Sequence, residues 1–258
     1  FAFSPAAAAG FFAFLNEIGE NRADSEIYLK GQLAGPLTIG LQLKDDKGRY
    51  IYYDKQIRDI LIKTLTMHGK WQVKELGKFG LPVIMFVDEP GIRAYGQFSY
   101  ITITKEMILD DMQALLQGLQ DAGALTGVHS CDAIDWTILF EMSELDIVSF
   151  DAYGYFNSLL PYMNSLKGFL KRGGILAWGI VPTSEKVMDE TRESLLEKLF
   201  NQWDELSKRG IDRDLVLEQS LVTPSCGAGL LKYEEAERIY MLTAEVSGML
   251  RRLLSLKE

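Results

Sequence analysis

Short apolar runs alternate with longer helical segments along most of this chain, and that alternation limits the fold more than any other feature. The runs VIMFV (83–87) and ILAWGIV (175–181) are apolar at nearly every position. Strands of this kind are covered on both faces, as in a parallel sheet. Strands that alternate with helices form βα units, so we predict an α/β fold with a parallel sheet.

The predicted elements cover the chain with no repeat and no linker. We predict strands over 1–4, 27–33, 83–87, 125–131, 146–151, 175–181 and, for the last, within 215–223. We predict helices over 6–20, 56–79, 104–120, 136–142 and 158–171, from Thr183 or Ser184 to Arg209, and over 233–254. The length of 258 residues suits one TIM-like (β/α)8 barrel domain over 1–258. About seven strands are one too few, so we expect the first βα unit to lie upstream and the domain to be N-terminally incomplete.

Charge and composition exclude several classes of protein. The 27 basic and 36 acidic residues give a net charge of −9, which argues against a nucleic-acid partner. No apolar run approaches the roughly 18–20 residues of a membrane-spanning helix, so we expect no membrane partner. Two cysteines rule out a disulfide scaffold. We therefore expect a cytoplasmic protein whose thiols are free for chemistry or for a metal.

Residues capable of chemistry gather where the predicted strands end. They are Asp88 and Glu89; His129, Ser130 and Cys131; Asp151 and Tyr153; Thr183 and Ser184; Ser225 and Cys226. In a parallel barrel the carboxyl ends of the strands carry the chemistry. We therefore regard Asp88, Glu89, Asp151, Tyr153 and Ser184 as candidates for substrate binding.

The most specific pattern is His129-x-Cys131 together with Cys226. An imidazole and two thiolates are preferred ligands of Zn²⁺, and a catalytic zinc has three protein ligands and one open position. The other interpretation is structural. Free cysteines are commonly buried as small apolar residues, and His129 would then be a hydrogen-bonded histidine of the core. Spacing alone leaves both interpretations open.

Several segments together resemble a known family. They are DEPG (88–91), GVHSCD (127–132), LDIVSFDAY (145–153), AWGIVPTS (177–184) and LVTPSCGAGLL (221–231). They are similar to the catalytic barrel of cobalamin-independent methionine synthase, and more closely to its short single-barrel relatives in the uroporphyrinogen decarboxylase/methionine synthase-like superfamily. The similarity extends over nearly the whole chain. The family's I-G-S segment in the first strand has no counterpart here.

The resemblance implies roles for individual residues. His129, Cys131 and Cys226 match the zinc ligands of the family, and Asp151 stands where the family has a glutamate. Asp is shorter than Glu, so Asp151 is the least certain of the four as a metal ligand. Asp88 matches the acid that holds the amino group of homocysteine. On this basis Asp88, His129, Cys131 and Cys226 are the expected catalytic residues.

The function implied by the resemblance is zinc-dependent methylation of a thiol, as in methionine biosynthesis. The expected acceptor is homocysteine or a similar thiol. The expected methyl donor is methyl-folate or a methylcorrinoid, and a corrinoid protein is then a partner. Transfer from a corrinoid to another thiol, such as coenzyme M, is an alternative.

Two further functions remain open from the sequence. A decarboxylase of the uroporphyrinogen type shares the barrel but binds its substrate through arginines. Arg93 is the main arginine near a predicted strand end here. A non-catalytic binding protein would also fit an intact barrel with an acidic surface.

Overall fold

The computed structural model describes residues 1–21 and 27–255. By their contacts these residues divide into two compact units. Among the described residues, the first unit comprises 1–21, 27–128 and 142–145, and the second comprises 129–141 and 146–255. One barrel domain over the whole chain therefore stays a prediction.

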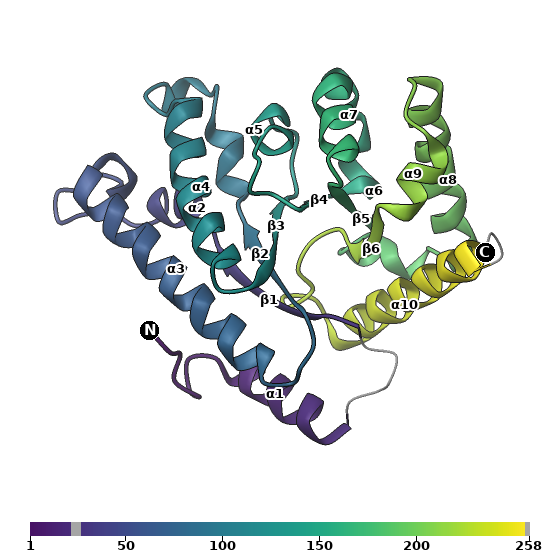
Figure 1. Ribbon diagram of the computed structural model, residues 1–258, viewed down its shortest axis with the longest axis horizontal. Helices are drawn as coiled ribbons and strands as arrows, with labels where there is room; N and C mark the ends of the chain where they lie inside the picture. Colours follow the sequence, from purple (N-terminus) through teal and green to yellow (C-terminus); the bar gives the residue numbers. More distant parts are fainter. Residues whose placement is uncertain (22–26, 256–258) are drawn as a thin grey trace. The chain divides into compact units, whose positions relative to one another are not determined.

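The first unit combines parallel strands with long helices. Its strands are β1 (Leu29–Ala34), β2 (Val83–Asp88) and the first five residues of β3 (Ala124–Ser130). Its helices are α1 (Ala9–Asn21), α2 (Pro36–Gly40), α3 (Lys55–Gly77) and α4 (Lys105–Gln120), with the short 3-10 helices η1 (Ile51–Tyr53), η2 (Pro90–Ala94) and η3 (Phe98–Tyr100). Strands β1 and β2 pair in parallel, with Leu29 opposite Val83 and Ala34 opposite Asp88. Helix α3 contacts both β1 and α4 (Figure 1).

The core of the first unit forms because β2 is apolar on both faces and α4 on one. Five of the six residues of β2 are buried. Along α4, Ile108, Met112, Leu115 and Leu119 are fully buried, which is the spacing of one helix face. Thr104 caps α4 by accepting a hydrogen bond from the Met107 N–H.

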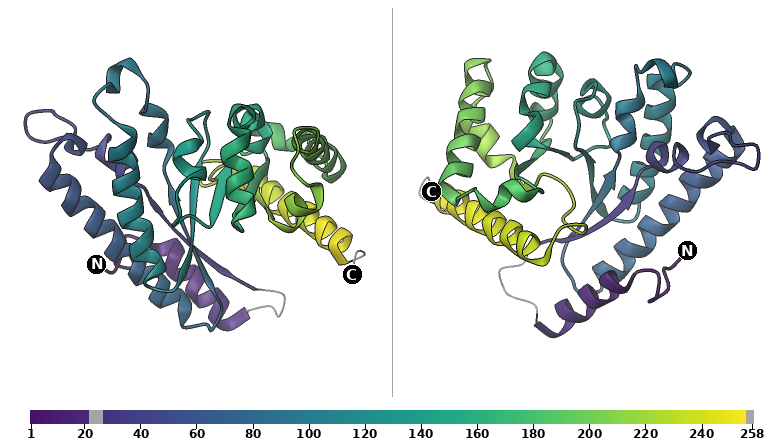
Figure 2. Two further views of the ribbon diagram at one scale, coloured as in Figure 1. Left: turned by 45° about the horizontal axis from the view of Figure 1, so that its top comes forward. Right: turned by 180° about the vertical axis from the view of Figure 1, so that it is seen from behind.

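The second unit contains the end of β3 and three further strands. The strands are β4 (Ile147–Phe150), β5 (Ile175–Val181) and β6 (Ser220–Pro224). The helices are α5 (Thr137–Phe140), α6 (Ala152–Tyr155), α7 (Met163–Lys171), α8 (Arg192–Lys208), α9 (Arg213–Glu218) and α10 (Tyr233–Ser255), with the 3-10 helices η4 (Phe156–Tyr162) and η5 (Glu185–Met188). Strands β4, β5 and β6 pair in parallel, in that order. Helix α8 contacts β5, and α10 contacts β5 and β6 (Figure 2).

The predicted helix from Thr183 or Ser184 to Arg209 is wrong at its start. Residues Glu185–Met188 form the 3-10 helix η5, and Ser184 makes no capping hydrogen bond through its side chain. The α-helix begins at Arg192, where Thr191 and Ser194 form a reciprocal capping box. The chain therefore leaves β5 through a long loop before it turns into α8.

The predicted strand over residues 1–4 is also wrong. The segment has no strand pairing, and the Phe3 ring lies 4.5 Å from the His68 ring and 5.7 Å from the Trp71 ring on α3. Its apolar side chains therefore pack on a helix instead of in a sheet.

The α/β fold with parallel strands is confirmed. The described residues contain six strands, of which β1 and β2 pair within the first unit and β4, β5 and β6 pair within the second. An eight-stranded barrel with an upstream first βα unit stays a prediction. None of the described helices has the length and apolar content needed to cross a membrane.

Candidate metal centre

Three side chains converge in the second unit. His129, Cys131 and Cys226 each offer a ligand atom, and these atoms all lie within 4.8 Å of one another. His129 is the next-to-last residue of β3, and Cys131 is the first residue after the strand. Side chains two residues apart on an extended chain point to the same side. The H-x-C spacing therefore presents the imidazole and the first thiol together.

The third residue, Cys226, is held in place by contacts with the end of β5. The Ser225 N–H donates a hydrogen bond to the Val181 carbonyl at 2.8 Å. The Thr183 N–H donates to the Ser225 hydroxyl at 3.1 Å, and the two hydroxyl oxygens lie 3.0 Å apart. These bonds tie the residue before Cys226 to the strand beside it.

Gly179 allows β4, β5 and the segment after β6 to come close together. A Cβ atom at this position would lie 2.5 Å from the Phe150 carbonyl oxygen and 2.8 Å from the Ser225 Cα. Both neighbouring atoms belong to the backbone, so a side chain could be accepted only by moving a strand. The glycine thus sets how near the Cys226 segment lies to the strands.

Ser149 orients the imidazole of His129. The hydroxyl of this serine, on β4, lies 2.9 Å from the His129 Nδ1 atom. The Nε2 atom is buried and has no hydrogen-bond partner. When Nδ1–H donates to Ser149, Nε2 carries a lone pair, which is the arrangement of a metal-ligating histidine whose second nitrogen is hydrogen-bonded.

The two thiols influence each other strongly. A hydrogen bond from the Cys131 thiol is the largest cause that lowers the pKa of Cys226 well below its ordinary value. The same interaction with Cys226, together with burial, raises the pKa of Cys131. Loss of the first proton from the pair is therefore favoured and loss of the second is disfavoured, and a cation bound between the two sulfurs would offset the repulsion of a second negative charge.

Asp151 does not belong to the group of mutually close ligand atoms. It caps α6, and its Oδ1 atom accepts a hydrogen bond from the Gly154 N–H at 2.7 Å. Burial is the largest cause that raises its pKa, and the charge of Cys226 contributes in the same direction. Direct ligation of a metal by Asp151 stays a prediction.

Tyr153 and Ser184 lie in the same unit in different surroundings. The Tyr153 hydroxyl donates a hydrogen bond to the Glu190 Oε1 atom at 2.6 Å, and this bond is the main cause that raises the pKa of Tyr153 to about 12. Ser184 is half-buried at the start of η5. Their assignment to substrate binding stays a prediction.

Asp88 and Glu89 belong to the first unit. Glu89 is fully buried, and its carboxylate accepts hydrogen bonds from the Leu37 N–H at 2.9 Å, the Thr38 N–H at 2.7 Å and the Thr38 hydroxyl. Burial raises its pKa to about 7. Glu89 thus joins the start of α2 to the end of β2. Asp88, the last residue of β2, is half-buried and interacts electrostatically with Lys30.

Sequence reasoning did not single out Ser149, Glu190 or Lys198. Ser149 carried a usable signal, because it is the one hydroxyl in the four-residue strand IVSF, which is buried throughout. Glu190 and Lys198 are charged residues next to or on a helix and carried no comparable signal.

A scan against models of protein families gives no match, and no curated protein is found to be similar to this chain.

Proposed function

We propose that this protein is a zinc-dependent methyltransferase that methylates the sulfur of a thiol. His129, Cys131 and Cys226 are the proposed zinc ligands. The observation that carries the proposal is the convergence of their ligand atoms within 4.8 Å. Cys226 comes from a segment far along the chain from the other two, so the convergence is not a consequence of sequence proximity.

The donor set fits zinc and leaves a position for a substrate. One imidazole and two thiolates match catalytic zinc sites with three protein ligands and an open fourth position. The buried Nε2 atom of His129, which has no hydrogen-bond partner, is the donor such an ion would satisfy. When bound, zinc would lower the pKa of an acceptor thiol, so that a thiolate is available at neutral pH.

The chain's own residues would orient the reactants. Ser149 holds the His129 ring through its Nδ1 atom. Asp88 is proposed to bind the ammonium group of a homocysteine-like acceptor through a charge-assisted hydrogen bond. Methyl-folate and a methylcorrinoid are the candidate donors, the second delivered by a corrinoid protein, and coenzyme M is the alternative acceptor.

Metal analysis of variants tests the ligand set. We expect about one zinc per purified chain, and loss of that zinc in Cys226→Ser and in His129→Gln because each removes one of three ligands. The chain has two histidines, and His68 lies on α3 in the other unit. His68→Gln is therefore the matched control and should retain the metal. A metal-free protein with full activity would contradict the proposal.

A donor and acceptor screen tests the reaction. Methyl-folate and methylcobalamin are each combined with homocysteine and with coenzyme M, and the S-methyl product is measured. We expect product with one donor in the wild type and none in Cys226→Ser. If neither donor methylates either thiol, a non-catalytic binding role is favoured instead.

A further inference from the structure

Helix α10 buries one face in the second unit and leaves the opposite face exposed. Its buried residues, at the spacing of a single helix face, are Ile239, Leu242, Val246 and Leu250. The helix contacts β5, β6 and α8 of the same unit (Figure 1). The Arg238 guanidinium also donates a hydrogen bond to the Glu190 carbonyl at 2.7 Å. These contacts fix which face of α10 points outward.

The outward face carries six residues that we call the outer stripe. They are Glu237, Tyr240, Met241, Ala244, Gly248 and Arg251. With about 3.6 residues per turn, these positions fall within an arc of about 100°. Tyr240 is 63% exposed and Met241 is 50% exposed. Because Tyr, Met and Arg are enriched in protein–protein interfaces, the outer stripe is a candidate interaction surface.

The middle of the outer stripe is flat because its side chains are small. Ala244 and Gly248 lie about one helical turn apart. A Cβ atom at Gly248 would have no neighbour within 4 Å, so the packing of the chain itself does not require a glycine there. Glycine in a helix interior is destabilising relative to alanine. A second helix whose axis approaches to about 8 Å would account for this residue.

The two charged residues of the outer stripe have no partner on their own helix. No residue of opposite charge lies three or four positions from Glu237 or from Arg251. In the part of the chain that the structure describes, neither forms an ion pair of 4.0 Å or less. Each charge is therefore able to pair with a charge on another molecule.

The spacing of these charges matches a second copy of the same helix. Glu237 lies seven residues before Ala244, and Arg251 lies seven residues after it. When two α10 helices cross at Ala244 in opposite directions, Glu237 of each copy lies level with Arg251 of the other. Tyr240 and Gly248 are each four residues from Ala244, so they also face each other between copies. A twofold interface requires this kind of self-complementary pairing.

We propose that the outer stripe binds a second copy of this chain in a twofold, antiparallel dimer centred on Ala244. Two ion pairs join Glu237 of one copy to Arg251 of the other. The Tyr240 ring of each copy lies against the backbone at Gly248 of the other. The interface requires neither the proposed metal nor the proposed reaction, so it stands or fails independently of them.

Sedimentation velocity of the whole chain at increasing concentration tests the dimer. We expect a mass that rises from 29.1 kDa towards twice that value, with and without a chelator. Ala244→Arg places a long charged side chain at the crossing point, so this variant should stay monomeric with an unchanged midpoint of urea unfolding. A wild type that is monomeric at every concentration overturns the proposal. So does a dimer that survives Ala244→Arg.

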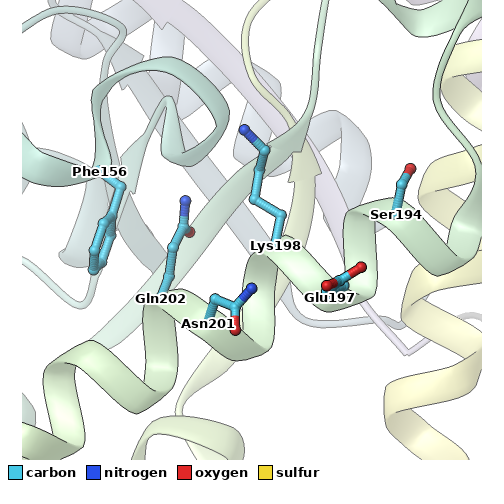
Figure 3. Close-up of a pocket in the computed structure, with 6 residues that line it drawn as sticks. All are labelled: Phe156, Ser194, Glu197, Lys198, Asn201 and Gln202. Carbon is cyan, nitrogen blue, oxygen red and sulfur yellow. The ribbon is translucent and has the colours of Figure 1, made fainter.

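Charge reversal tests the antiparallel pairing. Glu237→Arg and Arg251→Glu each place like charges opposite one another, and each should weaken dimerisation at least about tenfold. The double variant restores opposite charges and should dimerise as the wild type does. Glu197→Arg changes an exposed glutamate of α8 outside the outer stripe (Figure 3), so it is the matched control and should leave dimerisation unchanged. A double variant that dimerises as weakly as either single variant overturns the proposed pairing.

Discussion

Removal of the Ser149 hydroxyl isolates the contribution of one hydrogen bond to metal binding. The Ser149→Ala variant loses the contact to His129 Nδ1, which measures 2.9 Å between heavy atoms that belong to neighbouring strands. Ser149 is 5% exposed, so water cannot readily replace the hydroxyl. Loss of such a partner typically weakens metal affinity by about 10- to 100-fold, or about 1.4–2.7 kcal/mol. A competition titration of zinc against a chromophoric chelator measures the change.

Ser130→Ala is the matched control for this experiment. Ser130 directly follows His129 in β3, is fully buried, and has a hydroxyl without a hydrogen-bond partner. Its removal should leave zinc affinity unchanged, because no bond is lost. The reasoning is refuted if Ser149→Ala binds zinc as tightly as the wild type, or if Ser130→Ala loses as much affinity.

Three further predictions concern the strands that flank the candidate sites. The unfolded chain releases the Glu89 proton near pH 4.5 and the folded protein near pH 7. The free energy of unfolding of the wild type should therefore fall by about 3 kcal/mol as the pH rises through that window. Glu89→Gln lacks this proton, so urea unfolding of both proteins at several pH values measures the effect. A difference between the two that does not change with pH contradicts the prediction. Gly179→Ala should lower both the unfolding free energy and zinc affinity, because its Cβ would meet backbone at 2.5 Å. By contrast Gly168→Ala, in open space on α7, should stabilise by about 0.5–1 kcal/mol in the same assays. Asp88→Asn should raise the KM for the acceptor thiol and retain zinc; loss of the metal would show that its role is misassigned.

The sequence predicts strands well where every position is apolar and poorly where pairing depends on distant partners. Strand β5 is observed over the predicted residues 175–181, and β2 extends one residue beyond the prediction. The apolar start of the chain lacks a strand because Phe3 packs against His68 and Trp71. Such aromatic packing between a terminal segment and α3 has no local sequence signal.

The convergence of His129, Cys131 and Cys226 was predictable, because carboxyl ends of parallel strands meet at one edge of a sheet. The residues that surround these three side chains were harder to predict. The hydrogen bond from His129 to Ser149 depends on the rotation of two side chains on separate strands. The position of Lys198 over Tyr153 depends on where α8 begins, and the predicted start was misplaced.

The link between Ser225 and the end of β5 makes the candidate metal centre depend on the pairing of β5 with β6. Ser225 is hydrogen-bonded to residues at the end of β5, so Cys226 lies beside His129 and Cys131 only while these strands are paired. An ion bound there would connect two parts of the chain that are far apart in sequence. Its stabilising effect would follow the free concentration of the ion, since a ligand that binds only the folded form adds to stability by mass action. A low free concentration of that ion would then lower the free energy of unfolding of the protein before it altered any chemistry.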